Sequence, residues 1–236
     1  GLDVHRARTN VALLDETTGE MVGSRSVPTE KVPELVGALP TPARVVMEAG
    51  TTSMVLARTL KSCIADVSVV DCTEARRQLK SMATAKNDRI DAENLAIAHS
   101  KGRLEYGFIW VPDQLTAELR VLTRTRIRLV RQRVSCQVQL RNVLDQIDHP
   151  RVGGAMTSQA TRRWLDELDL RPSEAAAVRP FVRLLDDLTE EIKLLEAHTR
   201  ALSSDCEICA LLMTLPGVAD VLAPTMHAEI GAIERF

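Results

Sequence analysis

The chain of 236 residues is 45% hydrophobic and 26% charged, with a formal net charge of −2, which is typical of a globular protein with one large domain or two smaller ones. Aromatic residues make up only 3%, so the core must be aliphatic, and the base-stacking surface that single-strand binders use is not evident. A signal peptide and an apolar run long enough to span a bilayer are both absent, which predicts a cytoplasmic protein without a membrane partner.

The first hundred residues alternate between strand and helix patterns. Four stretches are apolar or alternating in the manner of strands, the first two forming a β-hairpin: residues 2–14, 21–27, 44–48 and 67–70. Four others have helical spacing: residues 28–39, 51–62, 73–82 and 88–99. Since strands alternate with helices, we predict an α/β fold in which helices cover a sheet.

After Gly102 a last short apolar segment at residues 108–112 gives way to long helices. Residues 113–148 contain neither proline nor glycine, and their leucines follow the 3,4 spacing of a coiled coil. Residues 149–154 break this helix, and a second helix carries leucines at the same spacing from Leu185 to Leu202. The spacing fits an antiparallel pair within the chain and a pair across a dimer equally well.

Positive charge is concentrated in the first long helix. Residues 120–163 contain ten arginines against two acids. Four of the arginines share one helical face, because they are four, four and three residues apart: Arg120, Arg124, Arg128 and Arg131. A solvated face is the alternative, but no matching acids lie nearby in the sequence, so phosphates of DNA or RNA are the predicted partners.

The five cysteines are odd in number and widely scattered, which predicts reduced thiols: Cys63, Cys72, Cys136, Cys206 and Cys209. The last two have the spacing of half a zinc site, but no second pair faces them, so ordinary packing on a helix is favoured.

A turn at Pro216 and Gly217 separates two helical patterns, residues 207–213 and 220–230. Helix-hairpin-helix modules use such a turn to direct backbone N–H groups at a phosphate, so Gly217 is a candidate nucleic-acid-binding residue. These modules usually have a second glycine where Ala219 stands, and a plain turn between helices fits equally well.

Four acids lie where strands end or helices begin. Asp3 and Glu48 lie within or just after apolar strand runs, where an unpaired carboxylate is costly to bury. Asp88 and Asp91 are one turn apart at a helix start, where a cap and a first-turn charge would also explain them. Together the four predict a site for one or two divalent cations, Mg²⁺ or Mn²⁺ rather than zinc, since hard oxygen ligands suit these ions. Two such ions clamp the oxygens of a phosphodiester, which indicates phosphoryl transfer on a nucleic acid.

Five motifs occur in a specific order: Gly1-Leu2-Asp3-Val4, Val46-Met47-Glu48-Ala49, Asn87-Asp88-Arg89-Ile90-Asp91-Ala92, Trp110-Val111-Pro112 and Ile230-Gly231-Ala232-Ile233-Glu234-Arg235-Phe236. With these motifs the chain resembles the DEDD transposases of bacterial insertion sequences, a family that includes Piv-type DNA invertases. The resemblance implies a RuvC-like ribonuclease-H fold at residues 1–112, an arginine-rich coiled coil at residues 113–205, and the start of a small helical C-terminal transposase domain at residues 206–236. Asn87, where a threonine is common, and Ala219 depart mildly from the family's pattern.

Carried over to this sequence, the family's four catalytic and metal-binding acids fall on Asp3, Glu48, Asp88 and Asp91. The resemblance also implies Mg²⁺ as cofactor, with Mn²⁺ as a substitute, and a homo-oligomer, dimer or tetramer, through the coiled coil. DNA, a structured guide RNA and a nucleoid-associated place in the bacterial cytoplasm are further implications. The family places a catalytic serine further along the C-terminal domain, and no matching motif contains any of these serines: Ser53, Ser135, Ser203 and Ser204. We therefore expect a parent chain that continues beyond Phe236 and, lacking an initiator methionine here, begins before Gly1.

Three functions fit this sequence. The favoured one is a Mg²⁺-dependent DNA transposase or recombinase that cleaves and transfers strands. The second is a Holliday-junction-type endonuclease of RuvC-like fold, which cleaves without joining. The third is a non-catalytic dimeric nucleic-acid-binding scaffold in which the acids serve as caps and salt-bridge partners.

Overall fold

A computed structural model of the chain describes residues 1–64, 66–79, 88–149 and 155–235, without the side chains of residues 79, 88, 89 and 235. The chain forms two compact units, Gly1–Asp113 and Gln114–Glu234. Within the described ranges, no helix is both long and apolar enough to cross a membrane.

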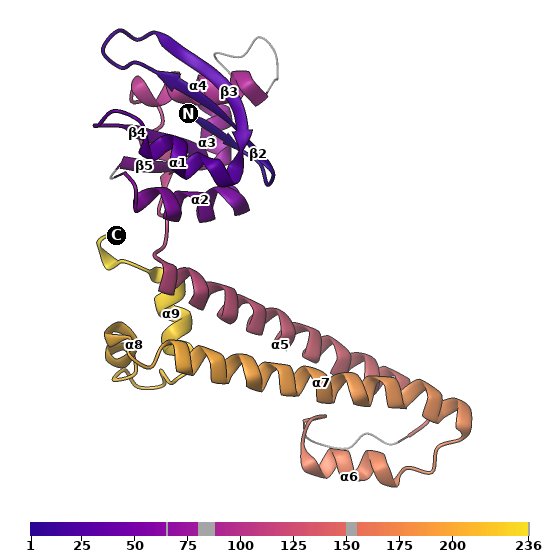
Figure 1. Cartoon of the computed structure of the whole chain (residues 1–236). Coiled ribbons are helices and arrows are strands. Elements are labelled where there is room, and N and C mark those ends of the chain that lie inside the picture. Colours follow the sequence, from indigo (N-terminus) through magenta and orange to yellow (C-terminus); the bar gives the residue numbers. More distant parts are fainter. Residues whose placement is uncertain (65, 80–87, 150–154, 236) are drawn as a thin grey trace. The chain divides into compact units, whose positions relative to one another are not determined.

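The first unit is built on a six-stranded mixed sheet in the order β3-β2-β1-β4-β5-β6 (Figure 1). The strands are β1 (Leu2–Val4), β2 (Arg8–Leu14), β3 (Met21–Pro28), β4 (Arg44–Glu48), β5 (Asp66–Val70) and β6 (Phe108–Ile109). β1, β2 and β3 form an antiparallel meander, β4 runs parallel to both β1 and β5, and β6 is antiparallel to β5. The predicted mixed α/β fold is confirmed.

Helices cover both faces of this sheet: α1 (Val32–Gly37), α2 (Thr51–Lys61), α3 (Cys72–Leu79) and α4 (Asp88–Ser100). Because side chains alternate along a strand, each strand serves two cores. On one face Leu2, Met47 and Val69 pack with residues of α1 and α2. On the other, Val46 and Val70 pack with residues of α3 and α4.

The structure corrects the prediction of one strand over residues 2–14. A turn at residues 5–7 divides this stretch, and the His5 N–H donates to the Arg8 carbonyl oxygen at 3.2 Å across it. Thr29 directly follows β3, and its hydroxyl stabilises the turn by donating to the His5 carbonyl oxygen at 2.8 Å. The division makes β1 a central strand between β2 and β4, and the predicted hairpin is formed by β2 and β3.

Helix α4 packs closely against the start of β1. A Cβ atom on Gly1 would lie 2.1 Å from the carbonyl oxygen of Ala92 and 2.7 Å from the amide nitrogen of Ala96. This backbone contact requires glycine at the position just before β1 and is helped by the small alanines in the helix. As a result, the first turns of α4 lie over β1.

The second unit consists of helices: α5 (Gln114–Gln146), α6 (Gln159–Glu167), α7 (Pro172–Leu202), α8 (Glu207–Leu212) and α9 (Leu222–Ile230). α5 and α7 run antiparallel (Figure 1), since Arg126 pairs with Glu196 at 2.7 Å while Cys136 donates to the Phe181 carbonyl oxygen at 3.6 Å. The pair therefore forms within the chain, which was one of the two arrangements that the leucine spacing allows. α6, a short helix capped by the Ser158 hydroxyl, was not predicted.

Candidate functional site

Asp3 and Glu48 lie on the same face of the sheet, on neighbouring parallel strands. Leu2 of β1 pairs with Met47 of β4, and both side chains lie in the core on the α1–α2 side. The next residue in each strand must face the opposite side, so Asp3 and Glu48 both project towards α3 and α4. They also lie near the carboxyl ends of these strands, the edge where parallel sheets commonly bind ligands.

Asp91 joins these two acids from α4, whose neighbouring residue Ala92 is fully buried. Burial raises the pKa of Glu48 above its ordinary value, the nearby Arg76 guanidinium lowers it, and the negative charge of Asp3 raises it again. The Cys72 thiol lowers this pKa by hydrogen bonding, and the charge of Asp91 raises it. The charges of Asp3 and Asp91 both act on Glu48, and all three acids belong to elements that meet on the α3–α4 side of the sheet.

The fourth predicted acid, Asp88, is the first residue of α4, but its side chain lies outside the described residues. Among the side chains that the structure describes, no three from His, Cys, Asp and Glu are close enough together to hold one metal ion. Cys206 and Cys209 are free thiols and belong to no such group of metal-binding side chains among the described residues. The structure thus gathers Asp3, Glu48 and Asp91 on one face without forming a closed ligand set from the described residues.

Asp3 has two polar neighbours that the sequence analysis missed. His5 Nε2 lies 3.1 Å from Asp3 Oδ2, and Asn10 Nδ2 donates to the same oxygen at 3.5 Å. Asn10 occupies this place because it pairs directly with Asp3 across the antiparallel β1–β2 ladder. The register of a hairpin turn at residues 5–7 would have revealed this contact, but the turn was not recognised in the sequence.

Glu48 likewise has two neighbours from α3 that were missed. The Cys72 thiol donates to the Ala49 carbonyl oxygen at 2.9 Å, next to Glu48 in the chain. Burial and, next, the charge of Glu48 raise the pKa of the Cys72 thiol. Arg76 follows one helical turn after Cys72 and is exposed. The sequence indicated only that a helix follows the strand at residues 67–70, because the place of β5 beside β4 is a tertiary feature.

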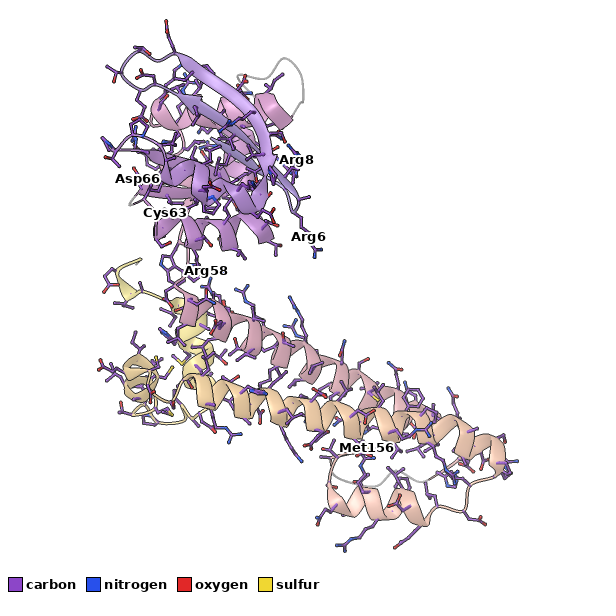
Figure 2. The ribbon with its side chains drawn as sticks, in the orientation of Figure 1. Arg6, Arg8, Arg58, Cys63, Asp66 and Met156 are labelled. Carbon is purple, nitrogen blue, oxygen red and sulfur yellow. The ribbon has the colours of Figure 1, made fainter. Side chains whose placement is uncertain are left out.

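A basic rim lies at the edge of the sheet that carries these acids. Arg6 and Arg8 project outward at the turn between β1 and β2, which starts two residues after Asp3 (Figure 2). Arg8 is held by Ser26, with its Nη2 donating to the carbonyl oxygen at 2.9 Å and its Nε to the hydroxyl at 3.2 Å. Arg6 is exposed to solvent.

In the second unit, the predicted arginine row divides into two pairs. Arg120 donates to the carbonyl oxygens of Ala228 and Glu229, at 2.5 and 3.2 Å, at the end of α9. Arg124 donates hydrogen bonds to both carboxylate oxygens of Glu229, at 2.7 and 2.8 Å. No acid lies near Arg124 in the sequence, but Glu229, which is 105 residues away, pairs with it in the fold.

The other two members of the row, Arg128 and Arg131, are exposed. Within the described part of the chain, neither makes a hydrogen bond or an ion pair. Gly217 lies in the turn between α8 and α9 with φ of 83°, a left-handed conformation that glycine adopts without strain. A role of these three residues in nucleic-acid binding stays a prediction.

Comparison with known proteins identifies two similarities. A profile of the DEDD transposase family of IS110 elements, described as a transposase, matches residues 1–149. The chain is also 26% identical over 245 residues to the transposase for insertion sequence element IS1111A of Coxiella burnetii (strain RSA 493 / Nine Mile phase I). That match covers 100% of this chain and 64% of the relative, so the chain spans less than two thirds of the relative's length.

The contact between Glu48 and Cys72 predicts a change in thiol reactivity. Glu48→Gln should accelerate alkylation of Cys72 by iodoacetamide, up to about tenfold for each unit by which the thiol pKa falls, because the thiolate is the reactive form. Peptide mass spectrometry at mildly alkaline pH measures the rate, with the exposed Cys63 as internal reference. Glu34→Gln, in α1 on the other side of the sheet, is the control. Equal rates in both variants would contradict the contact.

The bonds to the end of α9 predict a second measurable effect. Replacing both Arg120 and Arg124 by glutamine removes four hydrogen bonds from this helix end, so backbone amides of α9 should exchange with deuterium faster. The matched control replaces both Arg128 and Arg131 on the same helix. Hydrogen exchange with mass spectrometry compares the two double variants, and identical uptake in α9 would show that the bonds do not hold it.

Proposed function

Because the chain belongs to the DEDD transposase family of IS110 elements, we propose that it carries the acidic half of the active site of an insertion-sequence transposase. The reaction is divalent-metal-dependent cleavage and transfer of DNA strands. The observation that carries this proposal is the gathering of Asp3, Glu48 and Asp91 on one face of the sheet, where Asp3 and Asp91 raise the pKa of Glu48. Such clustered carboxylates are costly unless a cation lies among them.

The donor atoms fit Mg²⁺, with Mn²⁺ as a substitute. All are carboxylate oxygens, the ligands that hard divalent cations prefer. Asp3, Glu48 and Asp91 would hold the ion together with Asp88, which the family resemblance adds. When bound, the metal supplies a Lewis acid that stabilises charge on the phosphoryl oxygens.

The residues around the acids have a supporting role. His5 and Asn10 both contact Oδ2 of Asp3, whose side chain is only 18% exposed, and so fix the orientation of the carboxylate. Within the described part of the chain, Oδ1 of Asp3 accepts no hydrogen bond and remains available to a cation. The Cys72 thiol similarly contacts Glu48 and anchors α3 to the end of β4.

The remaining features of the proposal follow the family resemblance. They are a RuvC-like ribonuclease-H fold, a structured guide RNA, a cytoplasmic location and a catalytic serine in a segment outside this chain. Adjacent parallel strands that each carry an acid support the fold assignment. The greater length of the IS1111A transposase supports the expectation of a further segment.

Self-association is also part of the proposal, through the paired helices α5 and α7. Val134 and Val138 of α5 and Leu184 of α7 are about half exposed, which leaves apolar surface on the pair. A groove of about 350 Å³ lies between the two helices, and its lining is partly polar: Gln132, Ser135, Cys136, Gln139, Leu184 and Leu188. Burying this surface against a second copy would remove apolar area from water.

One observation favours the scaffold function instead: among the described residues, no three metal-binding side chains form a ready site. In that case the acids would act only as caps and ion-pair partners. Substituting one cap costs about 1 kcal/mol of stability and would leave any activity intact. Substitutions of the acids separate the two functions.

In the full-length protein, Glu48→Gln and Asp91→Asn should each reduce strand transfer by about 100-fold or more, because each removes a charge that stabilises the reacting phosphate. Mn²⁺ binding, followed by electron paramagnetic resonance, should weaken in parallel, while the melting temperature and DNA affinity stay close to wild type. Glu34→Gln on α1 is the control. Retained strand transfer in both acid variants would show that these acids are caps and ion-pair partners rather than the reaction centre, and cleaved but unjoined ends in the wild type would identify an endonuclease.

For nucleic-acid binding we expect only Arg128 and Arg131, which make no hydrogen bond or ion pair within the described residues, to contribute. Replacing both Arg128 and Arg131 by glutamine should lower the slope of log K against log salt by about 1.8, since each phosphate contact contributes about 0.9. Replacing Arg120 and Arg124 should leave the slope nearly unchanged, because α9 occupies both side chains. Fluorescence anisotropy with a short DNA duplex measures both, and equal slopes in all proteins would remove α5 from the binding surface.

A further inference from the structure

Arg76 is a cation beside the acids that the proposed metal chemistry does not use. It lies in α3, which begins directly after β5 and packs on the same face of the sheet as Asp3 and Glu48. The packing is fixed by Ala75, which is fully buried with Val46 and Val70. The residue next to Arg76 in the chain therefore anchors α3 beneath the site.

A second contact fixes the side of α3 that faces the acids. Cys72 donates to the Ala49 carbonyl oxygen at 2.9 Å, directly after Glu48. Arg76 is four residues later, so it lies on the same side of the helix, one turn away. The charge of Arg76 is also the largest influence of any single side chain on the ionisation of Glu48.

The adjacent arginine has a different environment. Arg77 donates to both carboxylate oxygens of Glu74, at 2.9 and 2.8 Å, and so is held on its own helix. Arg76 is exposed, and in the ranges that the structure describes it makes no hydrogen bond and no ion pair within 4 Å. Its five N–H donors are therefore available to a ligand.

A cation at this position is unfavourable for metal binding by Glu48 alone, because it repels a divalent ion. The cost is offset if the guanidinium binds a third, anionic component of the same site. Its planar fork of donors matches two oxygens of a phosphate. The exposed position leaves room for a nucleic-acid strand.

We propose that Arg76 binds a phosphate of the nucleic-acid strand and so positions the phosphodiester beside Asp3, Glu48 and Asp91. This inference rests on the proposed function, since it takes the acids as the reaction centre. It gives Arg76 a substrate-binding role in addition to its effect on the ionisation of Glu48.

The test compares Arg76→Gln with Arg77→Gln in the full-length protein, because the two variants remove the same charge from adjacent positions. Arg76→Gln should lower strand transfer by about 100-fold, the cost of a misplaced reacting group. It should leave Mn²⁺ affinity equal to or tighter than that of the wild type. Arg76→Lys should restore strand transfer only in part, since a point charge replaces the fork. Arg77→Gln should behave as the wild type.

A structural or counter-ion role gives a different result. If Arg76→Gln tightens Mn²⁺ binding and keeps full strand transfer, the proposal is overturned. Should Arg76→Gln fail to fold, Arg76→Lys decides: full activity overturns the proposal, and partial activity with unchanged Mn²⁺ binding supports it.

One further measurement separates failure of this inference from failure of the proposed function. If the wild type binds no Mn²⁺ and transfers no strands, the proposed function fails. The salt dependence of binding to a short DNA duplex, measured without metal, then judges Arg76 alone. A slope lower by about 0.9 in Arg76→Gln than in Arg77→Gln supports the phosphate contact, and equal slopes overturn it.

Discussion

The parallel pairing of β1 with β4 is the constraint on which the candidate site depends. It places Leu2 beside Met47 in one core and, because side chains alternate along strands, it places Asp3 and Glu48 together on the other face. Helix α4 packs against the start of β1. Its backbone approaches Gly1 too closely to allow a side chain there. Without this pairing the acids would be separate caps and strand ends, and each would have the ordinary explanation that local sequence suggests.

Electrostatics then gives the site its chemical character. Asp3 and Asp91 act on Glu48 with like charge, and partial burial adds to the cost of ionising it. Two kinds of positive charge relieve this cost: the guanidinium of Arg76 and the divalent metal that we propose. They have distinct roles, because a metal stabilises charge on the reacting phosphate whereas a guanidinium orients it through paired hydrogen bonds.

In the second unit, long-range partners decide what each arginine does. Arg124 and Arg128 are one helical turn apart on α5, look equivalent in the sequence and are both exposed, yet only Arg124 pairs with an acid of the described residues, Glu229 of α9. Arg124 holds α9 against α5, whereas Arg128 presents its charge to solvent. A row of basic residues is thus divided between folding and the proposed nucleic-acid contact.

Local patterns in the sequence determined most of the elements, although not α6 or the division of residues 2–14 into β1 and β2. The strand over residues 44–48 matches β4, and the absence of proline and glycine over residues 113–148 gave the helix that the structure places at Gln114–Gln146. Residue chemistry and family motifs likewise indicated the acids and the transposase family. Strand and helix periodicities are local properties, so they specify which segments form and which face of each is apolar.

Tertiary structure alone decided which segments meet. The turn that makes β1 a central strand depends on Thr29 and Arg8, and the place of Cys72 and Arg76 beside Glu48 depends on β5 lying next to β4. The antiparallel pairing of α5 with α7, which the leucine spacing fitted as well as a dimer, was settled in the same way. Such contacts join residues far apart in the sequence, and periodicity carries no information about the partner of a face.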